Sequence, residues 1–494
     1  MRPDFAPRRA EIVPSYSTQF PIDRWVVMSD VGKQDEGGLH RGLGNRHIQL
    51  MSIGGAIGTG LFMGSGKTIS VSGTSIILTY MTIGFFLFFT MRAMGEILLA
   101  NLRFKSFSDF CSHYIGPWAG YFIGWSYWMT WVVVAIADCT VIGGYLRFWL
   151  PDLPLWIPAL VVLTTLLVLN LVAVRVFGEL EFWFALVKVI AITALIVAGA
   201  FMICTGYVAP TGVQASVLHL VERGSVFPYG VSGFFAGFQI AIFSFGGIEL
   251  IGTTAAETRN PTRTLPRAIN AVPVRVLFFY VLALSCIISV SSWAEIAADK
   301  SPFVQLFVLA GFPAAAGVIN LVVISSAMSA ANSGVFATSR MLYGLAANGQ
   351  GSGYFMRLSR ASVPVRGLLF SCFCMLAGLS VLYFMPEVMG AFTVLTTVSA
   401  ILYIFVWVMI LVAYLRYRRR DPQLHDASTF KMPGGRVMAW ACIAFFAFII
   451  CLLALERDTA EALSVMPAWF IGLAIMYRWR VAQASRKQLE KALN

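Results

Sequence analysis

Charged residues are scarce in this chain: Asp, Glu, Lys and Arg make up 12% of its 494 residues, whereas 58% are hydrophobic. A soluble domain normally carries about 25% charged residues. Together with a mean hydropathy of +0.76, this composition excludes a soluble globular protein and predicts a polytopic membrane protein. The net charge of +12 does not indicate nucleic acid, because the basic residues lie in loops, where the positive-inside rule places them.

Residues for metal binding and nucleophilic catalysis are also sparse. None of the five histidines lies deep in an apolar run, and the eight cysteines show no paired spacing. We therefore expect no structural disulfide, no metal site and no cofactor. A membrane-bound enzyme would need a nucleophile–base pair or a metal cluster, which this placement does not offer, so the sequence predicts a protein that is not an enzyme.

One segment imitates a nucleotide-binding motif. Gly64-Ser65-Gly66-Lys67-Thr68 resembles the end of a phosphate-binding loop, but Leu61 occupies the place of the first glycine. No soluble strand–helix unit surrounds it, as a true phosphate loop requires. The sequence therefore predicts no ATP binding.

Long apolar runs dominate what is present. A spanning helix needs about 20 apolar residues, and twelve runs qualify. They are 48–68, 74–100, 118–148, 156–174, 182–205, 230–256, 273–291, 313–343, 367–385, 388–415, 437–455 and 461–480. The stretch 301–312 is too short to span, and we expect a re-entrant or interfacial piece there.

Basic residues alternate with these runs. Lys and Arg cluster before the first run and after every even-numbered one, and are few in the opposite loops. This alternation predicts twelve spans with both termini in the cytoplasm. Residues 1–46 lack an apolar core and are predicted to be a cytoplasmic tail, followed by a membrane domain over 47–480 and a second cytoplasmic tail over 481–494.

The first run contains four glycines between Gly54 and Gly60. Each glycine in a helix interior costs roughly 0.5–1 kcal/mol relative to alanine, so a helix that only spans would not carry four within two turns. We therefore predict a helix broken near the middle of the bilayer. Backbone freed at that depth must line a cavity, and such broken helices are typical of secondary transporters.

The sixth run repeats the pattern with Gly246-Gly247, beside the carboxylate of Glu249. Breaks in runs 1 and 6 are one five-helix unit apart. This spacing predicts an inverted repeat of 48–205 and 230–415, with the last two helices, 437–480, appended. The alternative is that the glycines only permit close helix packing, which we favour for Gly120-x-x-x-Gly124 and Gly233-x-x-x-Gly237.

The two predicted breaks have opposite polarity. A half-helix beginning near Gly58-Thr59-Gly60 presents free N–H groups and a positive dipole end, which together attract a carboxylate by roughly 0.3–2 kcal/mol. The first half of the sixth run ends near Phe243-Ser244 and presents free carbonyls, which suit an ammonium group. One donor end and one acceptor end around a shared cavity describe a zwitterion site, and hence an α-amino acid.

Three ionisable residues lie within the apolar runs: Asp138, Lys188 and Glu249. A charge at mid-bilayer costs about 2.5–3.5 kcal/mol on insertion scales, so it normally faces the protein interior and marks a pathway. Lys188 is the candidate for releasing a proton, or for standing where a sodium-coupled carrier binds its ion. Glu249 is either a proton carrier or a cap for broken backbone, and Asp138 pairs with a cation, the substrate amine or a neighbouring helix.

Several segments together resemble one family. Residues 45–49, 54–62, 243–249 and 331–343 resemble the amino acid permeases of the amino acid–polyamine–organocation superfamily. Residues 64–70, 105–110, 177–185 and 232–241 fit the branch of that family that carries D-serine, D-alanine and glycine. The resemblance covers about residues 41–480.

The resemblance implies a twelve-helix carrier with the 5+5 inverted-repeat fold, importing a small amino acid with a proton across the bacterial inner membrane. It makes Phe243 similar to the lid over the substrate and Lys188 similar to a helix 5 lysine linked to proton coupling. Asp138 departs from the glutamate that many members have near this point.

The alternative functions are a carrier of proline, aromatic amino acids or γ-aminobutyrate, and a receptor that binds an amino acid without transporting it. The full set of expected substrate residues is Ile57, Gly58, Thr59, Gly60, Phe243, Ser244 and Phe245.

Overall fold

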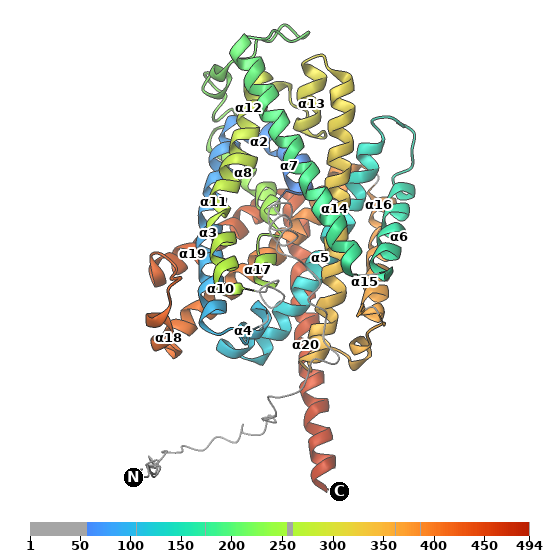
Figure 1. Ribbon diagram of the computed structural model, residues 1–494, viewed down its shortest axis with the longest axis vertical. Coiled ribbons are helices and arrows are strands. Elements are labelled where there is room, and N and C mark those ends of the chain that lie inside the picture. Colours follow the sequence, from blue (N-terminus) through green and yellow to red (C-terminus); the bar gives the residue numbers. More distant parts are fainter. Residues whose placement is uncertain are drawn as a thin grey trace, which may run out of the picture. The chain divides into compact units, whose positions relative to one another are not determined.

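The computed structural model describes residues 57–104, 106–172, 174–253, 260–360, 362–385 and 387–493. The chain divides into the units Met1–Leu39 and His40–Asn494, and all of the described residues belong to the second unit. The predicted tail 1–46 and the glycine pair Gly54-Gly55 lie outside the described residues. Within the described ranges every regular element is a helix, apart from an isolated bridge between Val208 and Gln214 (Figure 1).

Most predicted spans coincide with long helices. Nine helical stretches of the described chain are long and apolar enough to cross a membrane, and two shorter apolar ones cover Trp156–Leu171 and Gly230–Phe245. The helices of 14 to 37 residues are α3 (Ile76–Ala100), α5 (Pro117–Leu146), α6 (Trp156–Val172), α7 (Val174–Thr205), α14 (Pro313–Ala347), α15 (Val365–Gly378), α17 (Val388–Arg420), α19 (Gly435–Leu455) and α20 (Arg457–Leu493).

The first apolar stretch, Gly60–Ala100, covers the last part of the predicted span 48–68 and all of the predicted span 74–100. It begins with a π-helical turn over Gly60–Gly64 and continues as α2 (Ser65–Ser72). Gly73 then adopts φ +59°, and a short 3₁₀ turn leads into α3. The positive φ of Gly73 therefore ends the first run before the second begins.

The sixth run is interrupted where the sequence predicts. It forms α8 (Gly230–Ala241) and a 3₁₀ turn over Ile242–Phe245, and resumes as the short α9 (Leu250–Thr253) after Gly246-Gly247. Gly247 has φ +94°, a conformation that side chains disfavour. The prediction of a helix broken at this glycine pair is confirmed.

The seventh run, 273–291, follows α10 (Pro261–Asn270). It is formed by α11 (Val272–Arg275), a π-helical stretch over Val276–Leu282 and α12 (Ala283–Val290). Shorter helices connect the long ones. They are α4 (Phe107–Tyr114), α13 (Pro302–Leu309), α16 (Val381–Phe384) and α18 (Pro422–Ala427). With eight residues, α13 is too short to span, as predicted.

Helix α5 forms the centre of the bundle. In its apolar stretch 83% of the residues are buried inside the protein, compared with 22% in α20. It packs against α14 and α17 on two sides, and Figure 1 shows it among these helices. Side chains on α5 thus lie within reach of the interrupted segments.

The two GxxxG pairs serve close packing. A Cβ on Gly124 of α5 would lie 2.6 Å from the Leu345 side chain of α14. On α8, a Cβ on Gly233 would lie 2.6 Å from the Val71 carbonyl oxygen, and one on Gly237 would lie 2.9 Å from Ser72. The packing role predicted for these glycines is confirmed.

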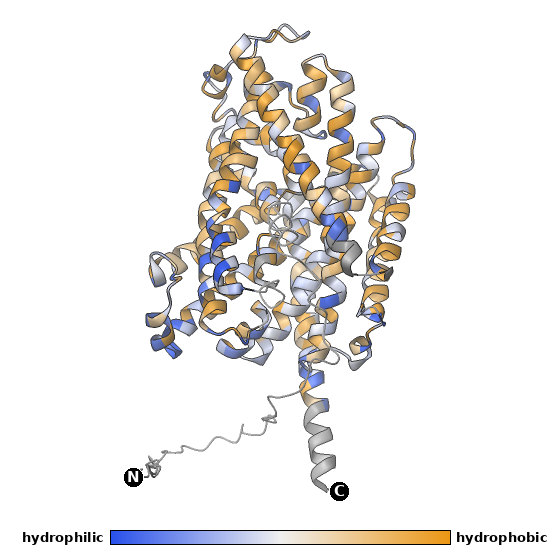
Figure 2. Cartoon of the chain, viewed as in Figure 1, coloured by the Kyte–Doolittle hydropathy of each residue, from blue (hydrophilic) through white to orange (hydrophobic). Residues whose placement is uncertain are grey.

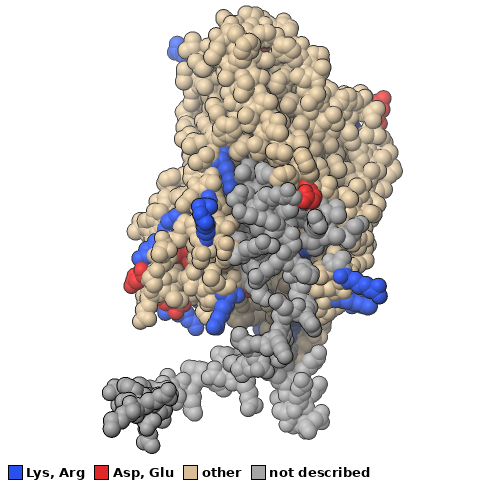
Figure 3. Space-filling model, viewed as in Figure 1, with Lys and Arg blue, Asp and Glu red and all other residues tan. Residues whose placement is uncertain are grey.

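Polarity separates the two ends of the bundle. Hydrophobic residues fill the helices, and hydrophilic ones gather around α10 and α18 (Figure 2). On the face shown in Figure 3, Lys and Arg also concentrate over this half, whereas the opposite half is almost uncharged. The last turn of α17, with Arg418, Arg419 and Arg420, contributes to the basic end.

Candidate functional site

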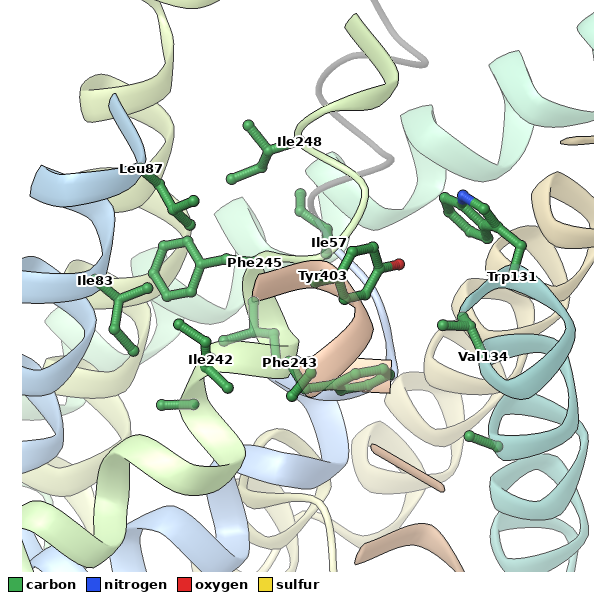
Figure 4. Close-up of a cluster of buried hydrophobic side chains, with 14 of the residues drawn as sticks. Ile57, Ile83, Leu87, Trp131, Val134, Ile242, Phe243, Phe245, Ile248 and Tyr403 are labelled. Atoms are coloured by element: carbon green, nitrogen blue, oxygen red, sulfur yellow. The ribbon is translucent and has the colours of Figure 1, made fainter. Parts of the chain in front are cut away.

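The start of the first described helix meets the broken sixth run at Gly60 and Ser244. A Cβ on Gly60 would lie 2.6 Å from the Ser244 Cα atom and 2.9 Å from the Phe243 ring. Real Cβ atoms do not approach backbone so closely, so glycine is required at this crossing. Figure 4 shows Ile57 and Phe243, one from each segment, beside this crossing.

The first segment begins its helix here. Leu61 and Phe62 donate their N–H groups to the Gly58 carbonyl at 3.2 and 3.3 Å. The N–H groups that open a helix have no partner within it, and the opening turn here runs through Gly58, Thr59 and Gly60. A Cβ on Gly58 would meet no described atom within 4 Å. Among the described residues, the helix therefore opens beside free space at Gly58.

Side chains from α14 and α5 fix this opening turn. Ser326 of α14 donates to the Ile57 carbonyl at 3.1 Å, and Thr59 donates to Asp138 Oδ1 of α5 at 2.6 Å. Asp138 is fully buried, and its Oδ2 has no partner among the described atoms. The sequence thus identified two residues, 79 positions apart, that the fold brings into contact.

In the second segment, the backbone carbonyls of Phe243 and Ser244 each already accept one hydrogen bond. Phe243 O accepts the Gly246 N–H at 3.0 Å, and Ser244 O accepts the Tyr280 hydroxyl at 2.8 Å. The expectation of free carbonyls here was wrong in that respect, because local turn formation and a tyrosine on the π-helical stretch use one lone pair of each. A carbonyl oxygen has two lone pairs, so each keeps one for a further donor.

The two phenylalanines of this turn point in different directions. The Phe243 ring meets Phe392 of α17 edge-on, with centroids 5.9 Å apart. Phe245 instead stacks on Tyr280 at 5.1 Å, and Figure 4 shows it directed toward Ile83 and Leu87 of α3. The Phe245 side chain belongs to the core, so its predicted place in the site rests on its backbone.

Glu249 holds the interrupted backbone of the sixth run. Both carboxylate oxygens accept the Gly247 N–H at 3.2 Å. Tyr127 of α5 donates to Oε1 at 3.2 Å, and Trp407 of α17 donates to Oε2 at 3.4 Å. Glu249 is fully buried, so these bonds satisfy polar groups that would otherwise be orphaned by the break.

Lys188 lies on α7 with 1% of its surface exposed. Its ammonium donates to the Ser329 hydroxyl of α14 at 3.0 Å. The carboxylates that act on it electrostatically are Glu181 and Asp138. The structure thus places Asp138 on the opening turn of the first segment and Glu249 on the break in the sixth run. Lys188 contacts α14 and lies within electrostatic reach of Asp138.

Sequence reasoning missed Glu181. It is 4% exposed and accepts hydrogen bonds from Ser329 at 2.7 Å and Asn332 at 2.9 Å. Its spacing of seven from Lys188 places both residues on one face of α7, which is the signal that was available. The described residues include no group of three His, Cys, Asp or Glu side chains that would hold a metal.

Comparison with known proteins finds amino acid permeases and amino acid transporters. The amino acid permease family model matches residues 47–490. The chain is 58% identical to the D-serine/D-alanine/glycine transporter of Escherichia coli (strain K12), over 92% of this chain and 97% of that protein. It is 49% identical to the amino-acid permease AapA of Bacillus subtilis (strain 168), over 89% and 95%. It is 38% identical to the aromatic amino acid transport protein AroP of Shigella flexneri, over 91% and 97%.

Proposed function

Because the chain belongs to the amino acid permease family, we propose that it is a symporter that imports D-alanine, D-serine and glycine, each with a proton. One observation carries the proposal: a helix start at Gly58–Gly60 lies against a helix end whose carbonyls keep free lone pairs at Phe243–Ser244. This pairing suits the carboxylate and the ammonium of one amino acid.

In this site the substrate carboxylate accepts hydrogen bonds from the N–H groups of Gly58, Thr59 and Gly60. The ammonium donates to the carbonyls of Phe243 and Ser244. The carbonyls of Ile57 and Phe245 border the same space, and the Phe243 ring covers the substrate. The open space beside Gly58 supports this arrangement.

The proposed architecture has twelve spans, with 48–205 and 230–415 as inverted repeats and 437–480 appended. The basic end of the bundle (Figure 3) faces the cytoplasm under the positive-inside rule, so the tails 1–46 and 481–494 lie there. The protein resides in the bacterial inner membrane and works by alternating access. Its energy source is the proton gradient; it uses no cofactor or ATP and performs no enzymatic reaction.

The substrate range is supported by the relatives. The relative at 58% identity is named for D-serine, D-alanine and glycine, whereas the one at 38% is named for aromatic amino acids. We expect excess unlabelled D-alanine, D-serine or glycine to suppress uptake of labelled glycine, and proline, phenylalanine and γ-aminobutyrate to leave it unchanged. Suppression by phenylalanine or proline but not by D-alanine would contradict the proposed range.

We propose that Glu249 is a cap for the broken backbone rather than the proton carrier. Glu249→Ala would leave the Gly247 N–H and the Tyr127 and Trp407 donors unsatisfied, at roughly 1–3 kcal/mol each. It should therefore lower thermal stability strongly. Glu249→Gln keeps an acceptor oxygen and should retain most stability and proton-driven uptake. Loss of proton-driven uptake in a stable Glu249→Gln protein would assign the proton to Glu249.

A further inference from the structure

A continuous hydrogen-bonded path connects two buried ionisable groups. The Lys188 Nζ atom donates to Ser329 Oγ at 3.0 Å, and the same hydroxyl donates to Glu181 Oε2 at 2.7 Å. All three residues are buried, with 1%, 2% and 4% of their surfaces exposed. Donors and acceptors follow one direction along the path, which is the alignment needed to pass a proton from the lysine to the glutamate.

The acceptor end is held in place by two asparagines. Asn332, one turn after Ser329 on α14, donates to Glu181 Oε1 at 2.9 Å. Asn170 of α6 in turn donates to the Asn332 oxygen at 2.8 Å. The Glu181 carboxylate is thus oriented by neutral side chains, and its Oε2 is left to face Ser329.

Charged groups on α5 and α7 act on this pair. The acidic groups that act on Lys188 include Glu181 on its own helix and Asp138 on α5. Lys188 acts on Glu181, and the polar side chains of α14 around Glu181 include Asn332, Ser329 and Ser333. Within the described part of the chain, Glu181 is the carboxylate that a hydroxyl bridge joins to Lys188.

We propose that Glu181 receives the transported proton from Lys188 through the Ser329 hydroxyl; this rests on the proton symport proposed above. In the step, an N–H bond of the ammonium breaks and its proton binds Ser329 Oγ. The original hydroxyl proton moves to Glu181 Oε2. The lysine becomes a neutral amine, the glutamate a neutral acid, and serine is regenerated, so the total charge is unchanged.

The position of Glu181 gives the transfer a direction. It lies seven residues before Lys188 on α7, which is about 10 Å along the axis toward the Val174 end. In the proposed topology this end is cytoplasmic. The proton crosses only the two hydrogen bonds at Ser329, of 3.0 and 2.7 Å. In this topology the step moves the proton toward the inner surface, where Glu181 releases it.

The test uses purified full-length protein in proteoliposomes that contain a pH-sensitive dye. Two rates are measured: substrate-dependent proton entry and exchange of labelled for unlabelled D-alanine without a gradient. Glu181→Gln should lower proton entry about a hundredfold, the scale of losing one proton-transfer partner, while exchange continues. Its exchange rate should also lose its dependence on pH. Glu179→Gln, two residues away on the same helix, is the matched control and should behave as wild type.

Ser329→Ala removes the bridge without removing a charge and is the second variant. It should slow proton entry while preserving exchange. Normal proton entry in Glu181→Gln would overturn the inference. If Glu181→Gln loses exchange as well, Ser329→Ala decides: normal proton entry in Ser329→Ala would overturn the inference, whereas slowed proton entry with preserved exchange would support it. Wild-type uptake without proton entry would instead refute the proposed symport itself.

Discussion

Replacing Lys188 by alanine is expected to abolish accumulation of substrate against a gradient while exchange of labelled for unlabelled substrate continues. The ammonium is almost fully buried and bonds Ser329 of α14 at 3.0 Å. Burying an ammonium is costly, and under the proposed symport its loss and gain of a proton accompany the conformational change. Without it, substrate should still bind but the proton should not be carried.

Accumulation ratio and exchange rate should be measured on the same preparation of Lys188→Ala. Lys300, which is exposed, provides the control: Lys300→Ala should retain both activities. Concentrative uptake by Lys188→Ala would show that the proton follows another path. Sodium dependence in the wild type would give Lys188 a different role, as the occupant of a cation position.

Replacing Gly60 by alanine should produce the largest loss of substrate binding. The new Cβ would lie 2.6 Å from the Ser244 backbone and 2.9 Å from Phe243, so one segment must move. Overpacking of this kind costs about 1–3 kcal/mol, and the displaced atoms are those proposed to hold the substrate. We expect an apparent affinity for D-alanine lower by about 10- to 100-fold, since about 1.4 kcal/mol corresponds to a factor of ten.

Two other glycines serve as controls for Gly60→Ala. Gly472 of α20 has no atom within 4 Å of an added Cβ, so Gly472→Ala should match wild type in both stability and uptake. Gly58 also has open space at that position. Gly58→Ala should therefore keep wild-type stability but weaken uptake, because its methyl group enters the proposed substrate space. Normal uptake by Gly60→Ala would contradict the location of the site.

The break in the sixth run could be predicted from its glycine pair, whereas the break predicted at Gly54-Gly55 lies outside the described residues. Paired glycines in an apolar run are costly unless backbone conformation or close approach requires them. Both requirements are present: Gly247 has φ +94°, and an added Cβ on Gly60 would collide with Ser244. Asp138 and Lys188 could be predicted as site residues for a similar reason, because an ionisable side chain within an apolar run is rare and costly.

Some features of the site could not be predicted because they depend on contacts between residues far apart in the sequence. Tyr280 occupies a lone pair of Ser244 O from 36 residues away, and Tyr280 also stacks on Phe245, turning that side chain into the core. Glu181 is joined to Ser329 across 148 residues. Periodicity places Glu181 on the face of Lys188, but only the packing of α7 against α14 shows which hydroxyl joins them.

The most direct test of proton-coupled transport is uptake of labelled D-alanine into proteoliposomes that contain only this protein. An inward proton gradient is compared with an inward sodium gradient and with no gradient. We predict accumulation above equilibrium with the proton gradient alone. Accumulation driven by sodium, or no D-alanine uptake under any gradient, would contradict the central claim that this chain is a proton-coupled carrier of small amino acids.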